Sequence, residues 1–102
     1  LGGDDLGPLR EAYLERVEDR LPARARAAGD WPIREDHCFA RVVLDNVFDD
    51  EWYGHVDGSP AYERLSRTEL ERAVALADRM LWEGRPAVIE LNENSLRWRG
   101  ER

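Results

Sequence analysis

The sequence predicts a single all-α domain, a small bundle of four to five helices joined by short loops. Apolar residues recur at helical spacing along most of the chain, and helix-start and helix-stop signals separate these stretches. The 102 residues are 42% apolar, which favours a packed core over disorder although 36% are charged. This length suits one domain over residues 1–102, with fraying expected at 1–5 and 99–102.

The first helix has a clear start, with Asp4 or Asp5 as its cap and Pro8 in its first turn. Apolar residues then follow near helical spacing, namely Leu6, Leu9, Tyr13, Leu14, Val17 and Leu21. Pro22 is predicted to kink or end this helix, because proline lacks the amide hydrogen that a helix interior needs. A short continuation is expected to stop at Gly29.

The second helix is predicted to begin near Glu35 or Asp36 and to carry apolar residues from Cys38 to Phe48. Its β-branched segment "VVL" would also suit a strand. The helix is favoured because the apolar set is too long and too periodic for one short strand.

The turn sequence "DGSP" carries one further helix-start signal at its end, and a second follows it. Ser59 is expected to cap a short helix that begins at Pro60. Ser66 and Glu69 form a capping box, in which each side chain accepts a hydrogen bond from the other residue's backbone. The helix that they open should end at Gly84 and lie at the centre of the bundle.

The last helix is predicted to have Pro86 in its first turn and to run towards Trp98. It carries the apolar residues Val88, Ile89, Leu91 and Leu96. Trp82, two residues before the preceding helix stops, is expected to fold over that helix end.

Composition excludes several classes of function. The net charge of −7 argues against duplex nucleic acid as a partner. All fifteen basic residues are arginines, so no lysine Schiff base or P-loop lysine is available. No run of 18 apolar residues is present, so no membrane partner is predicted. The single cysteine, Cys38, excludes an internal disulfide and predicts a reducing, cytoplasmic setting.

The stretch from 42 to 57 carries the main functional prediction. No basic residue lies between Arg41 and Arg64, and two aromatic residues follow three consecutive acids. Such a surface suits a protein partner or a cationic ligand. The predicted binding residues are Asp45, Asn46, Asp49, Asp50, Glu51, Trp52, Tyr53 and His55. The structural alternative is that the tryptophans only seal the ends of the bundle.

A small enzyme or a metal-dependent site is the second hypothesis, built from His37, Asp45, Asp49 and His55. These residue types ligate zinc or iron, but no pair has the spacing of HExxH or CxxC. We therefore predict no metal and no cofactor, and assign no catalytic residue. Cys38 shares a helix face with Val42 and is expected to be an inert core thiol.

The two polar residues within the apolar run have separate expectations. Asp45 is expected to be solvated or to pair with Arg41, one helical turn earlier. Asn46 must find a specific partner, because a buried unpaired amide costs about 1–3 kcal/mol. The expected partner is the extended segment "DWPI" or the loop at 54–59.

Overall fold

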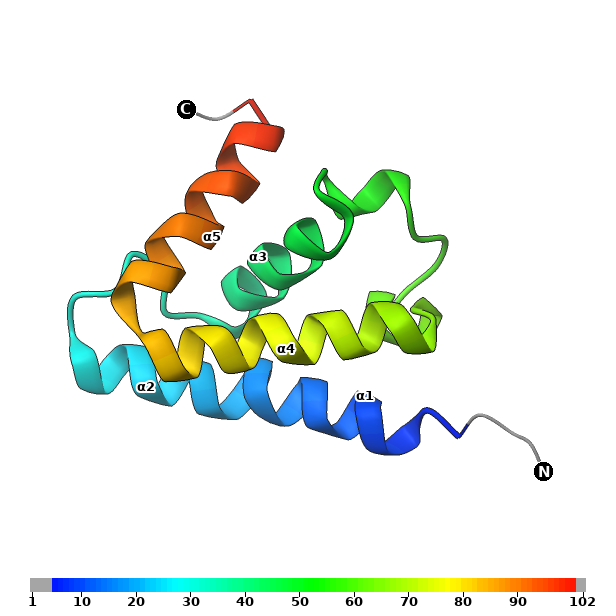
Figure 1. Cartoon of the computed structure of the whole chain (residues 1–102), viewed down its shortest axis with the longest axis horizontal. Coiled ribbons are helices and arrows are strands. Elements are labelled where there is room, and N and C mark those ends of the chain that lie inside the picture. Colours follow the sequence, from blue (N-terminus) through cyan, green and yellow to red (C-terminus); the bar gives the residue numbers. More distant parts are fainter. Residues whose placement is uncertain (1–4, 101–102) are drawn as a thin grey trace.

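Residues 5–100 are described by the computed structural model, and every regular element among them is helical. The N-terminal helical run is formed by α1 (Gly7–Leu14), the π-helical η1 (Glu15–Arg20) and α2 (Leu21–Ala28). Three more helices follow, α3 (Asp36–Phe48), α4 (Arg67–Glu83) and α5 (Arg85–Trp98) (Figure 1). The prediction of an all-α domain is confirmed.

The N-terminal run passes Pro22 without ending. Proline cannot donate the usual backbone hydrogen bond, and its ring crowds the carbonyl of the preceding turn. The wider π-helical turn of η1 lies directly before Pro22, which occupies the first turn of α2. The predicted interruption is thus a local widening. The run stops at Gly29, whose φ of 81° requires the left-handed conformation that glycine adopts readily.

The helical interpretation of "VVL" is confirmed, because α3 runs through it from Asp36 to Phe48. Glu35 before it is extended, and Asp49 after it is left-handed, with a φ of 55°. The side chains of Phe39, Val42 and Val43 are fully buried. Tertiary burial of this apolar face outweighs the strand propensity of the valines.

Helix α4 begins at the predicted capping box. Ser66 Oγ accepts from the Glu69 amide at 3.1 Å, and Glu69 Oε1 accepts from the Ser66 amide at 2.9 Å. The helix packs against α1, α3 and α5, which confirms its central place (Figure 1). Gly84 then turns the chain directly into α5. No helix within residues 5–100 is both long and apolar enough to cross a bilayer.

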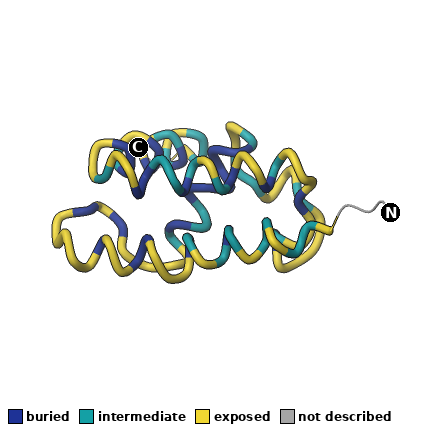
Figure 2. Tube along the Cα trace, turned by 60° about the horizontal axis from the view of Figure 1, so that its bottom comes forward, coloured by how far each residue is buried: buried dark blue, intermediate teal, exposed yellow. Residues whose placement is uncertain are grey.

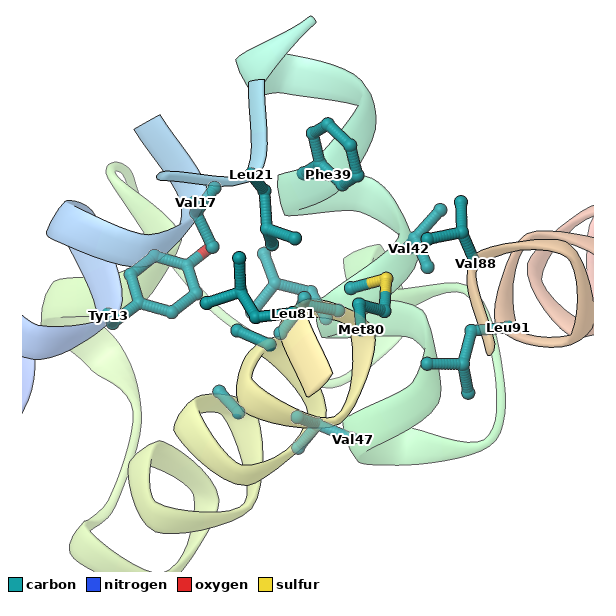
Figure 3. Close-up of a cluster of buried hydrophobic side chains, with 14 of the residues drawn as sticks. Tyr13, Val17, Leu21, Phe39, Val42, Val47, Met80, Leu81, Val88 and Leu91 are labelled. Atoms are coloured by element: carbon teal, nitrogen blue, oxygen red, sulfur yellow. The ribbon is translucent and has the colours of Figure 1, made fainter. Parts of the chain in front are cut away.

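The core gathers apolar side chains from all of these helices (Figure 3). The labelled members are Tyr13, Val17, Leu21, Phe39, Val42, Val47, Met80, Leu81, Val88 and Leu91. Exposed residues follow the outer side of the N-terminal run (Figure 2). The prediction for Trp82 is wrong, because this residue is 88% exposed and does not cover the helix end.

The connection between α3 and α4 is longer than the short loops predicted. It contains two short 3-10 turns, η2 (Trp52–Gly54) and η3 (Ala61–Arg64). Ala61 and Leu65 are buried and anchor it to the core. The predicted cap from Ser59 is wrong, because the residue that precedes η3 is Pro60 and no side chain caps this turn.

Candidate functional site

Asp45 is fully buried beneath the predicted surface, where its carboxylate accepts four hydrogen bonds. Its Oδ2 accepts from Ser95 Oγ at 2.6 Å and from Arg99 Nε at 2.7 Å. Its Oδ1 accepts from Arg99 Nη2 at 3.1 Å and from the Trp52 amide at 3.0 Å. The carboxylate therefore ties the end of α5 and the start of the long connection to α3. It is not available to a partner at the surface.

The expected pair between Arg41 and Asp45 is wrong. Arg41 donates to Ser95 Oγ at 2.8 Å and to Asn92 Oδ1 at 2.9 Å, both on α5. Ser95 Oγ accepts from Arg41 and donates to Asp45, so one hydroxyl separates the two charges. Arg41 therefore binds side chains of α5, which packs against α3, and not the acid one turn away on its own helix.

Asn46 has the specific partners that its burial requires, one within α3 and two on α5. Its Nδ2 donates to the carbonyls of Val42 at 2.7 Å and Leu91 at 3.0 Å. Its Oδ1 accepts from Asn94 Nδ2 at 3.1 Å. The predicted partners, "DWPI" and the 54–59 loop, are therefore wrong. The amide joins two helices and does not strap a loop.

Arg99 links the buried carboxylate to the surface. The hydrogen bonds that Arg99 donates to Asp45 raise the pKa of Arg99 above its usual value and outweigh the opposing effect of burial. Its guanidinium lies 4.9 Å from the centre of the Tyr53 ring, which makes a cation–π contact. Tyr53 is 60% exposed, and its ring centre lies 4.5 Å from that of Trp52. The network thus positions an aromatic pair beside α3.

The aromatic pair borders a groove along α3. Two hollows, of about 340 and 350 Å³, share His37, Ala40, Leu44 and Trp52, and we call them together the aromatic groove. One hollow extends to Arg41 and Tyr53, and the other to Tyr13, Leu14, Val17, Glu18, Asp36, Ser59, Pro60, Ala61 and Tyr62. Each hollow has the size of a small ligand site.

The charges that line the groove are mainly acidic. Glu18 forms no ion pair with any residue from 5 to 100, and Asp36 has only His37 nearby, at 3.7 Å. The guanidinium of Arg41 is already bound to α5. Burial, and to a smaller extent the Glu18 carboxylate, raise the pKa of Tyr13 well above its usual value. Tyr13 is therefore a neutral phenol, and the uncommitted charge in the groove is negative.

The acidic triplet on the adjoining connection is partly engaged by a neighbouring arginine and a neighbouring histidine ring. Asp49 lies 3.5 Å from Arg72, and Asp50 accepts from His55 Nε2 at 3.1 Å. This hydrogen bond lowers the pKa of Asp50, and the Glu51 amide adds a smaller effect in the same direction. The Glu51 carboxylate forms no ion pair within the described part of the chain. The triplet thus presents less free charge than the sequence implied.

The four residues of the second hypothesis, a metal or catalytic site, do not come together in the structure. His37 lines the groove, Asp45 is buried between α3 and α5, and His55 stacks on Phe48 with ring centres 4.9 Å apart. Residues 5–100 contain no group of three or more His, Cys, Asp or Glu side chains placed to hold a metal ion. The four residues proposed for metal or catalysis therefore have different surroundings.

Sequence reasoning missed the part of the groove that lies outside α3 and the long connection. Tyr13 and Glu18 come from the N-terminal run, where Tyr13 read as a core residue. Tyr62 stacks on Tyr13, with ring centres 5.9 Å apart, and no local signal joins two residues so far apart in the chain.

Searches of protein-family models, curated proteins and solved structures found no match.

Proposed function

We propose that the protein is a binding module whose aromatic groove receives a cationic protein segment carrying an apolar side chain. One observation carries the proposal: Trp52 is a shared wall of both hollows and stands beside the exposed Tyr53. Aromatic residues that line a hollow at the surface are typical anchors of protein interfaces.

The chemistry of the groove matches this partner. Ala40 and Leu44 on α3 supply an apolar floor for an aliphatic side chain. The free carboxylate of Glu18 and the aromatic faces attract a guanidinium or an ammonium group. The buried Asp45 network holds Trp52 and Tyr53 in place before binding, which lowers the entropy cost of ordering them.

The eight residues predicted from the sequence take different parts in this proposal. Trp52 and Tyr53 contact the partner, and Asp45 supports them from the interior. Asn46 joins α3 to α5 and does not touch the partner. The flanking acids Asp49, Asp50 and Glu51 contribute to electrostatic steering, which affects association rate more than affinity. His55 holds the Asp50 carboxylate through its ring nitrogen. The single free thiol, Cys38, supports a reducing, cytoplasmic setting for the interaction.

A blocking substitution tests the groove. Ala40→Arg places a large cation on the shared floor, and Ala75→Arg makes the same change at an exposed position of α4 outside the groove. The probe is a synthetic peptide of alternating arginine and leucine, titrated into ¹⁵N-labelled protein. We expect amide and indole shifts confined to the groove, and dissociation constants that rise on the order of 10-fold in Ala40→Arg only.

Two outcomes would contradict the proposal. One is a titration without shifts at the groove. The other is an equal shift of the aromatic-groove signals on adding a glutamate–leucine peptide of the same length, because a negatively charged groove must discriminate between the two. Raising the salt concentration should weaken binding of the basic peptide, since exposed charges are screened over about 10 Å at 0.1 M.

A further inference from the structure

A second groove, between the N-terminal run and α4, has the opposite charge. It has a volume of about 550 Å³ and is lined by Arg16, Arg20, Arg24, Asp78, Leu81 and Trp82. We call it the arginine groove. It shares no lining residue with the aromatic groove.

The three arginines differ in how far their charge is already satisfied. Arg16 is held by Asp78 at 2.6 Å and by Glu15 at 3.1 Å. Within the described residues Arg20 has only a distant contact with Glu15, at 4.0 Å, and its side chain is half exposed. The Arg24 side chain makes no hydrogen bond and no ion pair with any residue between 5 and 100. Two guanidinium groups in the groove are therefore open to a ligand.

Trp82 is the second independent feature of this groove. It is 88% exposed, while the neighbouring Leu81 is buried and fixes the backbone on which it stands. A single exposed apolar residue is ordinary in a folded protein. A tryptophan in a hollow with two unsatisfied arginines is more specific, because tryptophan and arginine are the residues most enriched among interface anchors.

We propose that the arginine groove binds an acidic protein segment, with carboxylates on Arg20 and Arg24 and an apolar side chain on Trp82. Arginine binds carboxylates through two parallel hydrogen bonds, which favours this pairing over a diffuse charge contact. Residues four apart on a helix are separated by about 6 Å along its axis. Acids at the same spacing on a helix, or two apart on an extended segment at roughly 6–7 Å, match the open arginines.

The overall charge decides between an acidic polypeptide and a nucleic acid. A nucleic acid is a long polyanion, and its binding depends on many cation–phosphate contacts. This chain has a net charge of −7 and offers two open arginines in the groove, so a polyanion that extended beyond the groove would be repelled. A short acidic segment meets only the groove. The protein thus carries two separate surfaces, for partners of opposite charge.

The test compares two double variants with the same change in net charge. Arg20→Gln with Arg24→Gln removes the open guanidinium groups of the groove. Arg26→Gln with Arg34→Gln removes two other exposed arginines, one on the neighbouring face of α2 and one beyond it. The probe is a synthetic peptide of glutamates around one central leucine, measured by calorimetry and by the shift of the Trp82 indole N–H. A third variant, Trp82→Ala, tests the apolar contact.

We expect the groove double variant to weaken peptide binding on the order of 10-fold, and the control double variant to leave it within about twofold. Trp82→Ala should also weaken binding, without loss of stability, because the side chain is exposed. Equal weakening by both double variants, or no shift of the Trp82 indole, would overturn the proposal. So would tighter binding of a single-stranded oligonucleotide of equal charge. Self-association abolished by the groove variant would also overturn it, because the occupant would then be a second copy of this chain.

The outcome is separable from that of the aromatic groove. Ala40→Arg lies outside the arginine groove and should leave binding of the acidic peptide unchanged. Each proposal can therefore fail alone.

Discussion

Replacing Asp45 with alanine should be the most damaging single change in the link between α3 and α5. The substitution removes a buried carboxylate that accepts four hydrogen bonds. The Ser95 hydroxyl, the Arg99 guanidinium and the Trp52 amide then lose the group to which they donate. The Asp45 side chain is fully buried, and that of Arg99 is only 11% exposed. A buried cation would therefore lose its counter-charge.

The expected loss in free energy of unfolding depends on how well Arg99 can reach solvent once Asp45 is removed. Breaking a buried ion pair by removing one partner costs about 3–5 kcal/mol. Arg99 lies at the end of α5 and retains a route to solvent along Tyr53, so we expect the lower end, about 3 kcal/mol. In a domain of this size each kcal/mol lowers the melting temperature by about 4–8 °C, so the expected drop is about 12–24 °C.

Urea unfolding followed by circular dichroism measures this loss. Asp57→Ala is the matched control, because Asp57 is exposed and should change the free energy of unfolding by no more than about 0.5 kcal/mol. Arg99→Ala and the double variant with Asp45→Ala complete a double-mutant cycle, and we expect the double variant to lose less than the sum of the single losses. A loss below about 1 kcal/mol for Asp45→Ala, or additive single losses, would refute the reasoning, since such a pair would contribute as little as an exposed one.

The remaining predictions concern three local features. Ser66→Ala removes one half of the capping box and should lower the free energy of unfolding by about 1 kcal/mol in urea unfolding, with α4 fraying in hydrogen exchange. Gly84→Ala should cost about 1–3 kcal/mol, because a φ of 76° with a ψ of −145° is accessible essentially to glycine alone, whereas Gly54→Ala meets open space and should cost less. The pKa of Asp50 is lowered in the folded protein by His55, so its stabilising contribution is complete above the usual value of 3.8 and is lost as the pH falls through the lowered pKa. Melting curves of Asp50→Asn between pH 2 and pH 6 should therefore show a smaller acid-dependent decrease, on the order of one titrating group, and an unchanged profile would contradict the pairing.

The amino-acid sequence by itself determined the helices and most of their ends. Capping boxes, left-handed glycines and apolar spacing act between residues at most a few positions apart, so Ser66, Gly29 and the periodic face of α3 could be interpreted without a fold. Pro22 was identified as a perturbation for the same local reason. The turn that absorbs it was not predictable, because a π-helical segment depends on how the whole run packs.

Only the tertiary structure decided the partners and the exposures. Asp45 stood out in an apolar run, but its counter-charge lies 54 residues away on Arg99, and local spacing pointed instead to Arg41. The exposure of Trp82 and the two grooves likewise depend on how helices dock side by side. Helix periodicity defines which face is buried, whereas the side chain that meets it is set by the crossing and register of two helices, which are properties of the assembled bundle.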